Sequence, residues 1–422
     1  MKYAIHKLDN TCRVCKSESL HKFLHLSDMP FTDDFVKQDS IGTEFLYPID
    51  IYFCRDCHTV QTQHDVSVDA YYEDYQYSVG ASGFASTFMK NMATTLCASY
   101  FKNAQGLKVL EVGSGDGEQL VPFKKLGCDV LGYEPSSYLV EMAALKGIPS
   151  VQGLFTADAI ANLPPDFQQV DIILLSYTFD HIPDPIDFLN GVKKILNPER
   201  GILVVENHDL EKIFERQEYC LFEHEHSIYL TKNTTISLAK RNGFEVVEFD
   251  VLPEHERRAN SLVFVMTLAN SAVAARAIEA YPLDQYAKPE FYDAESAKIK
   301  QGIQHFEKYI ERRTSEGKTL AGYGAGGRGV MTLAALTNAN RLAYMVDKKP
   351  KKPGVFSPKA HLGVYELDQL VKQPVDEIIV FSFGYMTEIK EDLAKMGYAD
   401  NQIISMLDVL KGINFTQPTK LD

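Results

Sequence analysis

The stretch that most constrains the fold is LKVLEVGSGDGEQL, residues 107–120. Its apolar first half predicts a buried β-strand, and a helical pattern begins after its last glycine. Between the two, three glycines alternate with Ser114 and Asp116. Glycine lets a chain turn sharply and bring backbone N–H groups close to a ligand. The stretch therefore predicts a strand, a ligand-binding loop and a helix, the first unit of a doubly wound α/β domain.

The residues around this loop favour a cationic nucleoside as its ligand. Glu118 follows Gly117, so the spacing is not the G-x-G-x-x-G that binds a pyrophosphate. Glu134, at the end of the next expected strand, is placed to accept both hydroxyls of a ribose. Glu111 and Asp116 suit a positive charge. These features resemble the S-adenosylmethionine site of class I methyltransferases, and a glycine turn without a ligand is the alternative. The resemblance assigns the following residues to the donor: Glu111, Gly113, Ser114, Gly115, Asp116, Gly117 and Glu134.

Two C-x-x-C pairs near the N-terminus predict a metal site. The pairs are CRVC and CRDC, which supply Cys12, Cys15, Cys54 and Cys57. Four thiolates at this spacing are the usual ligands of structural Zn²⁺. Disulfides are rare inside cells, and a redox site would need only one pair. A site closed by four ligands has no open position, so we expect no catalysis there.

Composition limits the partners of the chain. Its net charge of −14 argues against a broad surface for nucleic acid or for anionic membranes. No apolar run approaches the roughly 20 residues of a membrane helix. The first residues carry charges where a signal peptide would be apolar. We therefore expect a cytoplasmic protein without nucleic-acid or membrane partners.

The pattern along the chain predicts three domains in an α/β protein. Residues 1–70 form a small zinc-binding domain. Residues 71–288 contain successive strands of a mostly parallel sheet and form a class I methyltransferase domain with a Rossmann-like fold. Residues 289–422 open with a long charged helix over 289–316 and continue as a second Rossmann-like α/β domain.

A second glycine loop, LAGYGAGGRGVM, lies in the third domain. Gly322, Gly324 and Gly327 fit G-x-G-x-x-G, and Asp347 lies at the distance expected of a ribose-binding acid. Taken alone, the loop would indicate NAD, or NADP because two lysines follow the acid. Alternatively, the helix N-terminus binds a substrate phosphate with help from Arg328, or the loop only packs.

The sequence HEH places His224, Glu225 and His226 in a row. A lone cluster of this kind is most often a solvated surface group. In an extended chain, the two histidines would point to one side and Glu225 to the other. A metal site would need a third ligand, such as His208 or Glu206.

The order of these motifs resembles one enzyme family. CRVC and CRDC, then EVGSGDGE with GYEPS, then HEH and YGAGGRG…VDKKPKKPG, together are similar to the zinc-containing sugar-nucleotide C-methyltransferases of deoxysugar biosynthesis. The resemblance covers nearly the whole chain. It implies methylation of the carbon next to the keto group, C-3, of a nucleotide-linked 4-keto-6-deoxysugar, with dTDP or GDP as the nucleotide. It also implies a C-terminal domain that binds no dinucleotide and whose glycine loop serves the sugar nucleotide or the packing.

Carbon methylation needs a base and a group that stabilises an enolate. A histidine can be the base, and a nearby carboxylate can fix its tautomer. The resemblance makes His226 the base, places Glu225 against the substrate and leaves His224 in support. It makes His181, at the end of an expected strand, a donor to the keto oxygen; a helix cap or a core histidine is the alternative. The stretch YYEDYQYSVGAS is similar to a family segment over the methyl donor, which adds Tyr75, Tyr77 and Ser78.

Several positions depart from the family pattern. Glu223 replaces a tyrosine before HEH, and Lys359 replaces a proline–glycine pair. An asparagine pair becomes Ser176 and Tyr177, and a glycine pair becomes Ala259 and Asn260. We expect the changes to fall where the sugar binds and to leave the donor and zinc sites intact.

Other functions stay open from the sequence. An O- or N-methyltransferase acting on another small metabolite would need no enolate chemistry. An NAD(P)-dependent oxidoreductase would use the C-terminal glycine loop. A donor-binding module would have no catalytic activity.

Overall fold

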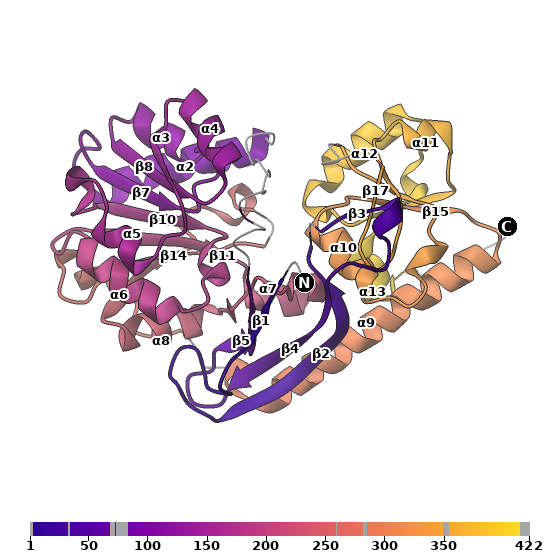
Figure 1. Cartoon of the computed structure of the whole chain (residues 1–422), viewed down its shortest axis with the longest axis horizontal. Helices are drawn as coiled ribbons and strands as arrows, with labels where there is room; N and C mark the ends of the chain where they lie inside the picture. The colour runs from indigo at the N-terminus through magenta and orange to yellow at the C-terminus, as the bar shows by residue number, and fades with distance from the viewer. Residues whose placement is uncertain are drawn as a thin grey trace.

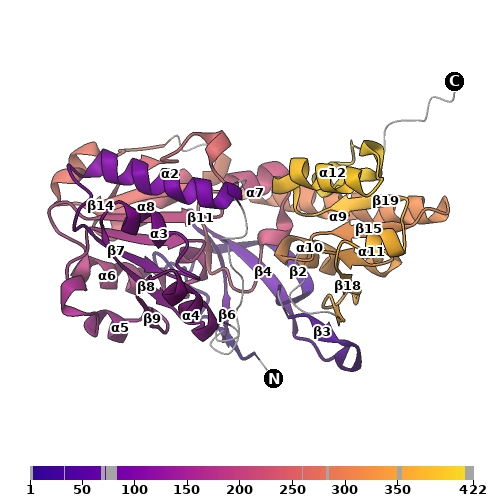
Figure 2. The ribbon, with the colours of Figure 1, turned by 90° about the horizontal axis from the view of Figure 1, so that it is seen from above.

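The computed structural model shows two α/β bodies at opposite ends of the long axis, with N-terminal strands between them (Figures 1 and 2). It describes residues 3–32, 34–67, 72, 83–258, 260–281, 285–348 and 354–413. No helix in these ranges is long and apolar enough to cross a membrane.

The larger body is built on a seven-stranded sheet in the order β13-β14-β11-β10-β7-β8-β9. Neighbouring strands are parallel except at β14, which is antiparallel to β11 and β13. The strand order reverses at β7 and β10, and open α/β sheets bind ligands at the carboxyl ends of such strands. The strands are β7 (Lys108–Val112), β8 (Asp129–Glu134), β9 (Ser150–Gln152), β10 (Ile172–Ser176), β11 (Ile202–Asn207), β13 (Phe244–Phe249) and β14 (Leu262–Leu268).

Helices cover both faces of this sheet because its strands are apolar on both sides. In β10, Ile172 and Leu174 belong to one apolar core, and Ile173 and Leu175 belong to another. The first core includes α2 (Gly83–Tyr100), α3 (Leu120–Lys125) and α4 (Ser137–Leu145). The second includes α5 (Ala157–Ala161), α6 (Pro185–Ile195) and α8 (Lys232–Arg241). Helix α2 lies along one face of the body (Figure 2).

The N-terminal strands form an antiparallel sheet in the order β12-β5-β4-β2. Three of its strands are β2 (Leu20–Pro30), β4 (Leu46–Cys54) and β5 (Val60–Thr62). The fourth, β12 (Ile228–Tyr229), follows the HEH sequence directly. Short pairs join β1 (Ile5–Lys7) to β6 (His64–Val66), and β3 (Val36–Lys37) to β17 (Val355–Phe356). The HEH sequence therefore lies where the N-terminal sheet meets the larger body.

The C-terminal body has a five-stranded parallel sheet in the order β18-β16-β15-β19-β20. The long helix expected over 289–316 is α9 (Pro289–Ser315), with proline in its first turn as helix starts favour. One apolar core contains residues of β2, of α9 and of this body. The strands are β15 (Leu320–Tyr323), β16 (Met345–Val346), β18 (Val364–Tyr365), β19 (Glu377–Val380) and β20 (Ile403–Ser405). The helices are α10 (Gly327–Ala334), α11 (Gln369–Lys372), α12 (Met386–Lys395) and α13 (Met406–Leu410).

Candidate functional site

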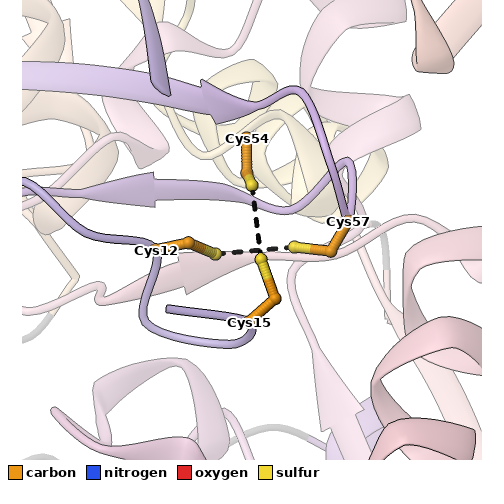
Figure 3. Close-up of side chains that lie close together, drawn as sticks. All are labelled: Cys12, Cys15, Cys54 and Cys57. Atoms are coloured by element: carbon orange, nitrogen blue, oxygen red, sulfur yellow. Dashed lines mark hydrogen bonds between the residues drawn. The ribbon is translucent and has the colours of Figure 1, made fainter. Parts of the chain in front are cut away.

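The four cysteines of the two C-x-x-C pairs converge on one point (Figure 3). Their sulfur atoms all lie within 4.8 Å of one another. The Sγ atoms of Cys12 and Cys57 are 3.5 Å apart, and those of Cys15 and Cys54 are 3.6 Å apart. A disulfide would need about 2.05 Å, whereas Zn–S bonds of about 2.3 Å in a tetrahedron separate the sulfurs by about 3.8 Å. The cluster thus fits zinc and does not fit disulfides.

The first glycine loop leaves its backbone open to a ligand. Gly113, Gly115 and Gly117 have φ of 71°, 54° and 73°, in the left-handed region that favours glycine. A Cβ atom built on Gly113 would meet Thr178 at 2.4 Å, but one built on Gly115 would meet no atom within 4 Å. The open space at Gly115 is where a donor can approach the chain.

Glu134 is held at the end of β8 by two backbone N–H groups. The N–H of Gly115 donates to its Oε2 at 2.8 Å, and that of Ser136 donates to its Oε1 at 2.9 Å. Burial raises the pKa of the Glu134 carboxyl above its ordinary value. Each carboxylate oxygen keeps a lone pair for a further donor, so the residue fits the hydroxyls of a ribose.

The other acidic residues of the loop have partners or are shielded. Asp116 forms an ion pair with Lys146 at 2.8 Å. Burial raises the pKa of the Glu111 carboxyl well above its ordinary value, and its Oε2 has no hydrogen-bond partner in the described part of the chain. Ser114 is also buried. Tyr75, Tyr77 and Ser78 lie outside the described residues.

The HEH sequence forms a turn, in which the N–H of His226 donates to the Glu223 carbonyl at 3.3 Å. Neither histidine lies on the surface, since His224 is 4% exposed and His226 is 2% exposed. The expectation from an extended chain, that both histidines point to one side, is wrong because the turn sends them into different surroundings. The alternative of a solvated surface cluster is also excluded.

His224 points into the N-terminal strands. It donates from Nε2 to the Met29 carbonyl, and its Nδ1 accepts from Nε2 of His64, both at 2.9 Å. Its ring stacks on Phe31. Burial lowers the pKa of His224 to about 3. In this position His224 ties the turn to the N-terminal strands.

His226 lies in a cluster of imidazoles at the carboxyl end of the large sheet. Its Nδ1–H donates to the Leu221 carbonyl at 2.8 Å, which leaves Nε2 unprotonated in the neutral ring. Its ring centroid is 4.8 Å from that of His181 and 4.9 Å from that of His208. Burial lowers the pKa of His226 to about 3, although the charge of Asp180 raises it. His226 is therefore a neutral imidazole whose Nε2 carries the lone pair.

His181 follows β10, in a single 3₁₀ turn over Phe179–His181. Its Nδ1 is 2.7 Å from the Tyr72 hydroxyl and 3.4 Å from Oε2 of Glu225. A cavity of about 20 Å³ adjoins this group. The lining residues are Asp65, Val66, Tyr72, His181, Pro183, His224, Glu225 and Ser227.

The sequence interpretation did not give a role to Asp180 or Tyr72, and considered His208 only as a metal ligand. Asp180 accepts at Oδ2 from Nδ1–H of His208 at 2.8 Å. Burial raises the pKa of the Asp180 carboxyl, but the bond from His208 and the nearby histidines outweigh burial and bring it well below its usual range. Ligand atoms of Asp180, His208 and His226 lie within 4.8 Å of one another, a spacing that a metal ion could also use. The only signal for Asp180 and His208 in the sequence was that each follows an expected strand, in TFDHI and in ENHDL.

The residues that depart from the family pattern are spread over three places. Ser176 donates to Oε2 of Glu206 at 2.6 Å, and the Tyr177 hydroxyl donates to the Asn260 carbonyl at 3.1 Å. Lys359 contacts the N-terminal strands instead, where its Nζ donates to the Ser27 carbonyl at 3.0 Å. Ala259 lies outside the described residues. A carboxylate oxygen of Glu223 lies 3.3 Å from the Cβ position built on Gly327, at the start of α10.

The second glycine loop is largely filled by the chain itself. The N–H of Ala325 donates to Oδ2 of Asp347 at 2.9 Å. A Cβ atom on Gly329 would meet the Gly324 carbonyl at 2.1 Å, so α10 packs closely on the loop. Arg328 forms an ion pair with the buried Glu218 at 3.3 Å. These contacts pack one side of the loop, whereas a Cβ atom built on Gly326 would meet no atom within 4 Å.

A larger cavity of about 370 Å³ lies between α7 (Leu210–Arg216) and α9. It contains none of the predicted site residues. Its lining consists of Glu211, Phe214, Glu215, Gln217, Gln285, Tyr286, Phe291, Glu295 and Lys298.

The sheet, the donor loop and the zinc cluster define an S-adenosylmethionine-dependent methyltransferase with a zinc-binding domain. Three family models match the chain: a zinc-binding domain at residues 12–72, a methyltransferase domain at 87–249 and a C-methyltransferase C-terminal domain at 270–407. The C-methyltransferase NovU of Streptomyces niveus is 24% identical over 90% of this chain and 90% of its own length. The chain belongs to the zinc-containing C-methyltransferases, as its sequence motifs predicted. The predicted fold class, methyl donor and zinc are confirmed.

Several other similar proteins match less than half of the chain. The ubiquinone biosynthesis O-methyltransferase of Bradyrhizobium sp. is 30% identical over 28% of this chain and 48% of its own length. Among solved structures, the plantazolicin methyltransferase BpumL with SAH is 16% identical, with a TM-score of 0.35 over 44% of this chain and 84% of its own. The PH0226 protein of Pyrococcus horikoshii is 16% identical, with a TM-score of 0.37 over 47% of this chain and 98% of its own.

Proposed function

We propose that this C-methyltransferase acts on the carbon next to the keto group, C-3, of a dTDP- or GDP-linked 4-keto-6-deoxysugar. The observation that carries the proposal is the pair of imidazoles, His181 and His226, with ring centroids 4.8 Å apart beside the Glu225 carboxylate. A carbon methyltransferase needs a base and an enolate stabiliser side by side. An oxygen or nitrogen acceptor would need no such pair.

His226 is the base in this proposal. Its Nδ1–H is fixed on the Leu221 carbonyl, so Nε2 is the atom that takes the proton from C-3. The electron pair of the broken C–H bond passes into the enolate, and the bound donor supplies the methyl group that the enolate attacks. Because burial lowers the pKa of His226 to about 3, the base is neutral near pH 7.

His181 is the donor to the keto oxygen. Its Nδ1 faces the Glu225 carboxylate and the Tyr72 hydroxyl, and the carboxylate favours the tautomer that carries the proton on Nδ1. A cavity of about 20 Å³ holds roughly one water molecule. We therefore expect the keto oxygen to replace the Tyr72 hydroxyl as the partner of His181 when the sugar binds.

We also propose a role for the third domain. With domain boundaries at residues 1–70, 71–288 and 289–422, the body over 289–422 would help to hold the sugar nucleotide. Glu223 supports this because its carboxylate, at the HEH turn, lies 3.3 Å from the Cβ position built on Gly327 at the start of α10.

The test is a set of dTDP- and GDP-linked 4-keto-6-deoxysugars, incubated with the donor and analysed by mass spectrometry. A gain of one methyl group with one of these substrates supports the proposal. Deuterium from D₂O should also enter C-3 in the absence of the donor, because proton removal precedes methyl transfer. Methylation without such exchange would point to an oxygen or nitrogen acceptor.

The role of His226 has its own test. His226→Asn should lower kcat by roughly 100-fold or more, the range of a general base, while calorimetry shows unchanged affinity for S-adenosylhomocysteine. If the variant methylates at nearly the normal rate, the base is another group.

A further inference from the structure

We propose that Asp180, held in place by His208, is a positioning residue that stabilises the protonated form of the His226 base. The inference rests on the proposed function, in which His226 removes a proton from carbon. It adds a carboxylate and a third imidazole to the reaction, neither of which touches the substrate.

The geometry places one buried carboxylate among three imidazoles. Asp180 is 2% exposed. Its Oδ2 accepts from Nδ1–H of His208 at 2.8 Å, and its Oδ1 lies 3.9 Å from Nε2 of His181. Oδ1 has no hydrogen-bond partner among the residues that the structure describes. The nearest ligand atoms of Asp180, His208 and His226 lie within 4.8 Å of one another.

Hydrogen bonds and ring packing hold Asp180 among the three imidazoles. The Ser227 hydroxyl donates to the Asp180 carbonyl at 3.0 Å, and the Ser227 N–H donates to the same oxygen at 2.7 Å. These bonds join the 3₁₀ turn of Asp180 to the residue after His226. The His208 ring packs against Tyr177 with centroids 4.6 Å apart, which orients the imidazole that holds the carboxylate.

Proton transfer to His226 creates a positive charge in a buried site. When Nε2 of His226 takes the proton, the C–H electron pair passes to the enolate and the imidazole becomes a cation. A buried cation is costly unless a countercharge is near. Among the described residues, the titratable and charged groups around this pair include His181, His208, Tyr72, Tyr177, Tyr229, Glu225 and Arg13. Asp180 remains ionised throughout and offsets the charge on His226.

A metal ion is the competing interpretation of the same three residues. In that case Asp180, His208 and His226 would be ligands, and His226 would have no lone pair left for a proton. The bond between His208 Nδ1–H and Oδ2 of Asp180 satisfies these two atoms without a metal, and the metal content of the variants below separates the two interpretations.

Three variants test the inference with the sugar nucleotide that the wild type methylates. Asp180→Asn keeps the shape and removes the charge. His208→Asn keeps a donor where Nδ1 lies, whereas His208→Leu removes it. Asp187→Asn is the matched control, since it removes the same charge from an exposed side chain in the first turn of α6.

We expect Asp180→Asn to lower kcat by roughly 10- to 100-fold, because an opposite charge moves a neighbouring pKa by about 1–2 units. KM and affinity for S-adenosylhomocysteine should change little. Deuterium exchange at C-3 should slow by the same factor as kcat. The kinetic isotope effect on kcat, measured with substrate deuterated at C-3, should be larger in Asp180→Asn than in the wild type. His208→Leu should share this loss, and His208→Asn should recover most of the rate. Asp187→Asn should match the wild type.

Other results overturn the inference. If Asp180→Asn keeps the wild-type kcat and isotope effect, or loses only affinity or stability, Asp180 is structural. If Asp180→Asn does not fold, equal kcat for His208→Leu and the wild type shows that the Asp180–His208 pair does not assist the base. A second metal equivalent per chain that is lost in His208→Leu would make the three residues a metal site. Absence of both methylation and exchange in the wild type would instead refute the proposed function itself.

Discussion

At the scale of residues, burial separates the two histidines of the HEH sequence. His224 lies between His64 and a backbone carbonyl, whereas His226 lies beside Asp180 and two further imidazoles. The same burial lowers the pKa of both to about 3. Only His226 has a buried carboxylate close enough to favour its cationic form. His224 and His226 thus have different chemical properties because their surroundings differ.

The depressed pKa values predict a dependence of stability on pH. His64 has a folded pKa of about 4, and His224 and His226 have about 3, compared with an ordinary 6.5. Between about pH 4 and 6.5 the unfolded chain therefore binds more protons than the folded protein. The free energy of unfolding should fall as the pH drops through this range, by up to about 1.4 kcal/mol per pH unit for each histidine.

Urea denaturation at pH 7, 6 and 5 measures this effect. The midpoint should move to lower urea concentration as the pH falls, and His224→Phe should show a shallower dependence because it removes one of the three groups. A midpoint that does not change between pH 7 and 5 would show that these histidines are not held neutral.

At the scale of elements, the loop between β7 and α3 combines strain with an open surface. Gly115 has φ of 54° and free space where a Cβ would lie. Gly106 is a matched position, because its φ is 76° and its Cβ position is also free, but it precedes β7 and lies away from the loop. The two glycines share a left-handed backbone conformation, and only Gly115 belongs to the loop proposed to bind the donor.

Gly115→Ala should therefore weaken donor binding beyond its effect on stability. Both Gly115→Ala and Gly106→Ala should cost about 1–2 kcal/mol of stability, the penalty of a left-handed alanine. Only Gly115→Ala should lower the affinity for S-adenosylhomocysteine, by roughly 10-fold or more, because its methyl group enters the donor space. Calorimetry and thermal denaturation measure the two effects. Equal affinity in the two variants would place the donor elsewhere.

At the scale of the whole molecule, the zinc cluster supports a site to which it contributes no ligand. Arg13, between Cys12 and Cys15, donates to the Pro183 carbonyl at 2.7 Å. Thr62, at the end of β5, donates to the His226 carbonyl at 3.0 Å. The zinc cluster thus fixes strands that contact the chain on both sides of the proposed catalytic histidines, at Pro183 after His181 and at His226 itself.

Loss of zinc should reduce methyl transfer and leave donor binding. Cys54→Ser should lower zinc from about one equivalent per chain and reduce kcat, while S-adenosylhomocysteine still binds to the separate glycine loop. Cys220→Ser, at a buried thiol outside the cluster, should retain its zinc. Elemental analysis and calorimetry measure these effects. Full activity in a zinc-free Cys54→Ser protein would contradict the supporting role.

Much of the fold could be predicted because its signals are local. The loop at Gly115, the position of Glu134 at the end of β8 and the helix over 289–315 follow from short patterns of spacing and periodicity. The pairing of β12 with β5 could not be predicted, because a two-residue strand has no pattern of its own. The motifs predicted His181 and His226 as site residues, and the structure places their ring centroids 4.8 Å apart. Asp180 was missed because its contact with His208 depends on how two strand ends meet.

The central claim is that the methyl group arrives on carbon after proton removal. Donor carrying a ¹³C-labelled methyl group, incubated with the enzyme and the dTDP- or GDP-linked 4-keto-6-deoxysugar that gains mass, gives a product whose ¹³C NMR spectrum identifies the methylated atom. We expect a methyl group bonded to the carbon next to the keto group. A methyl group bonded to oxygen would contradict it.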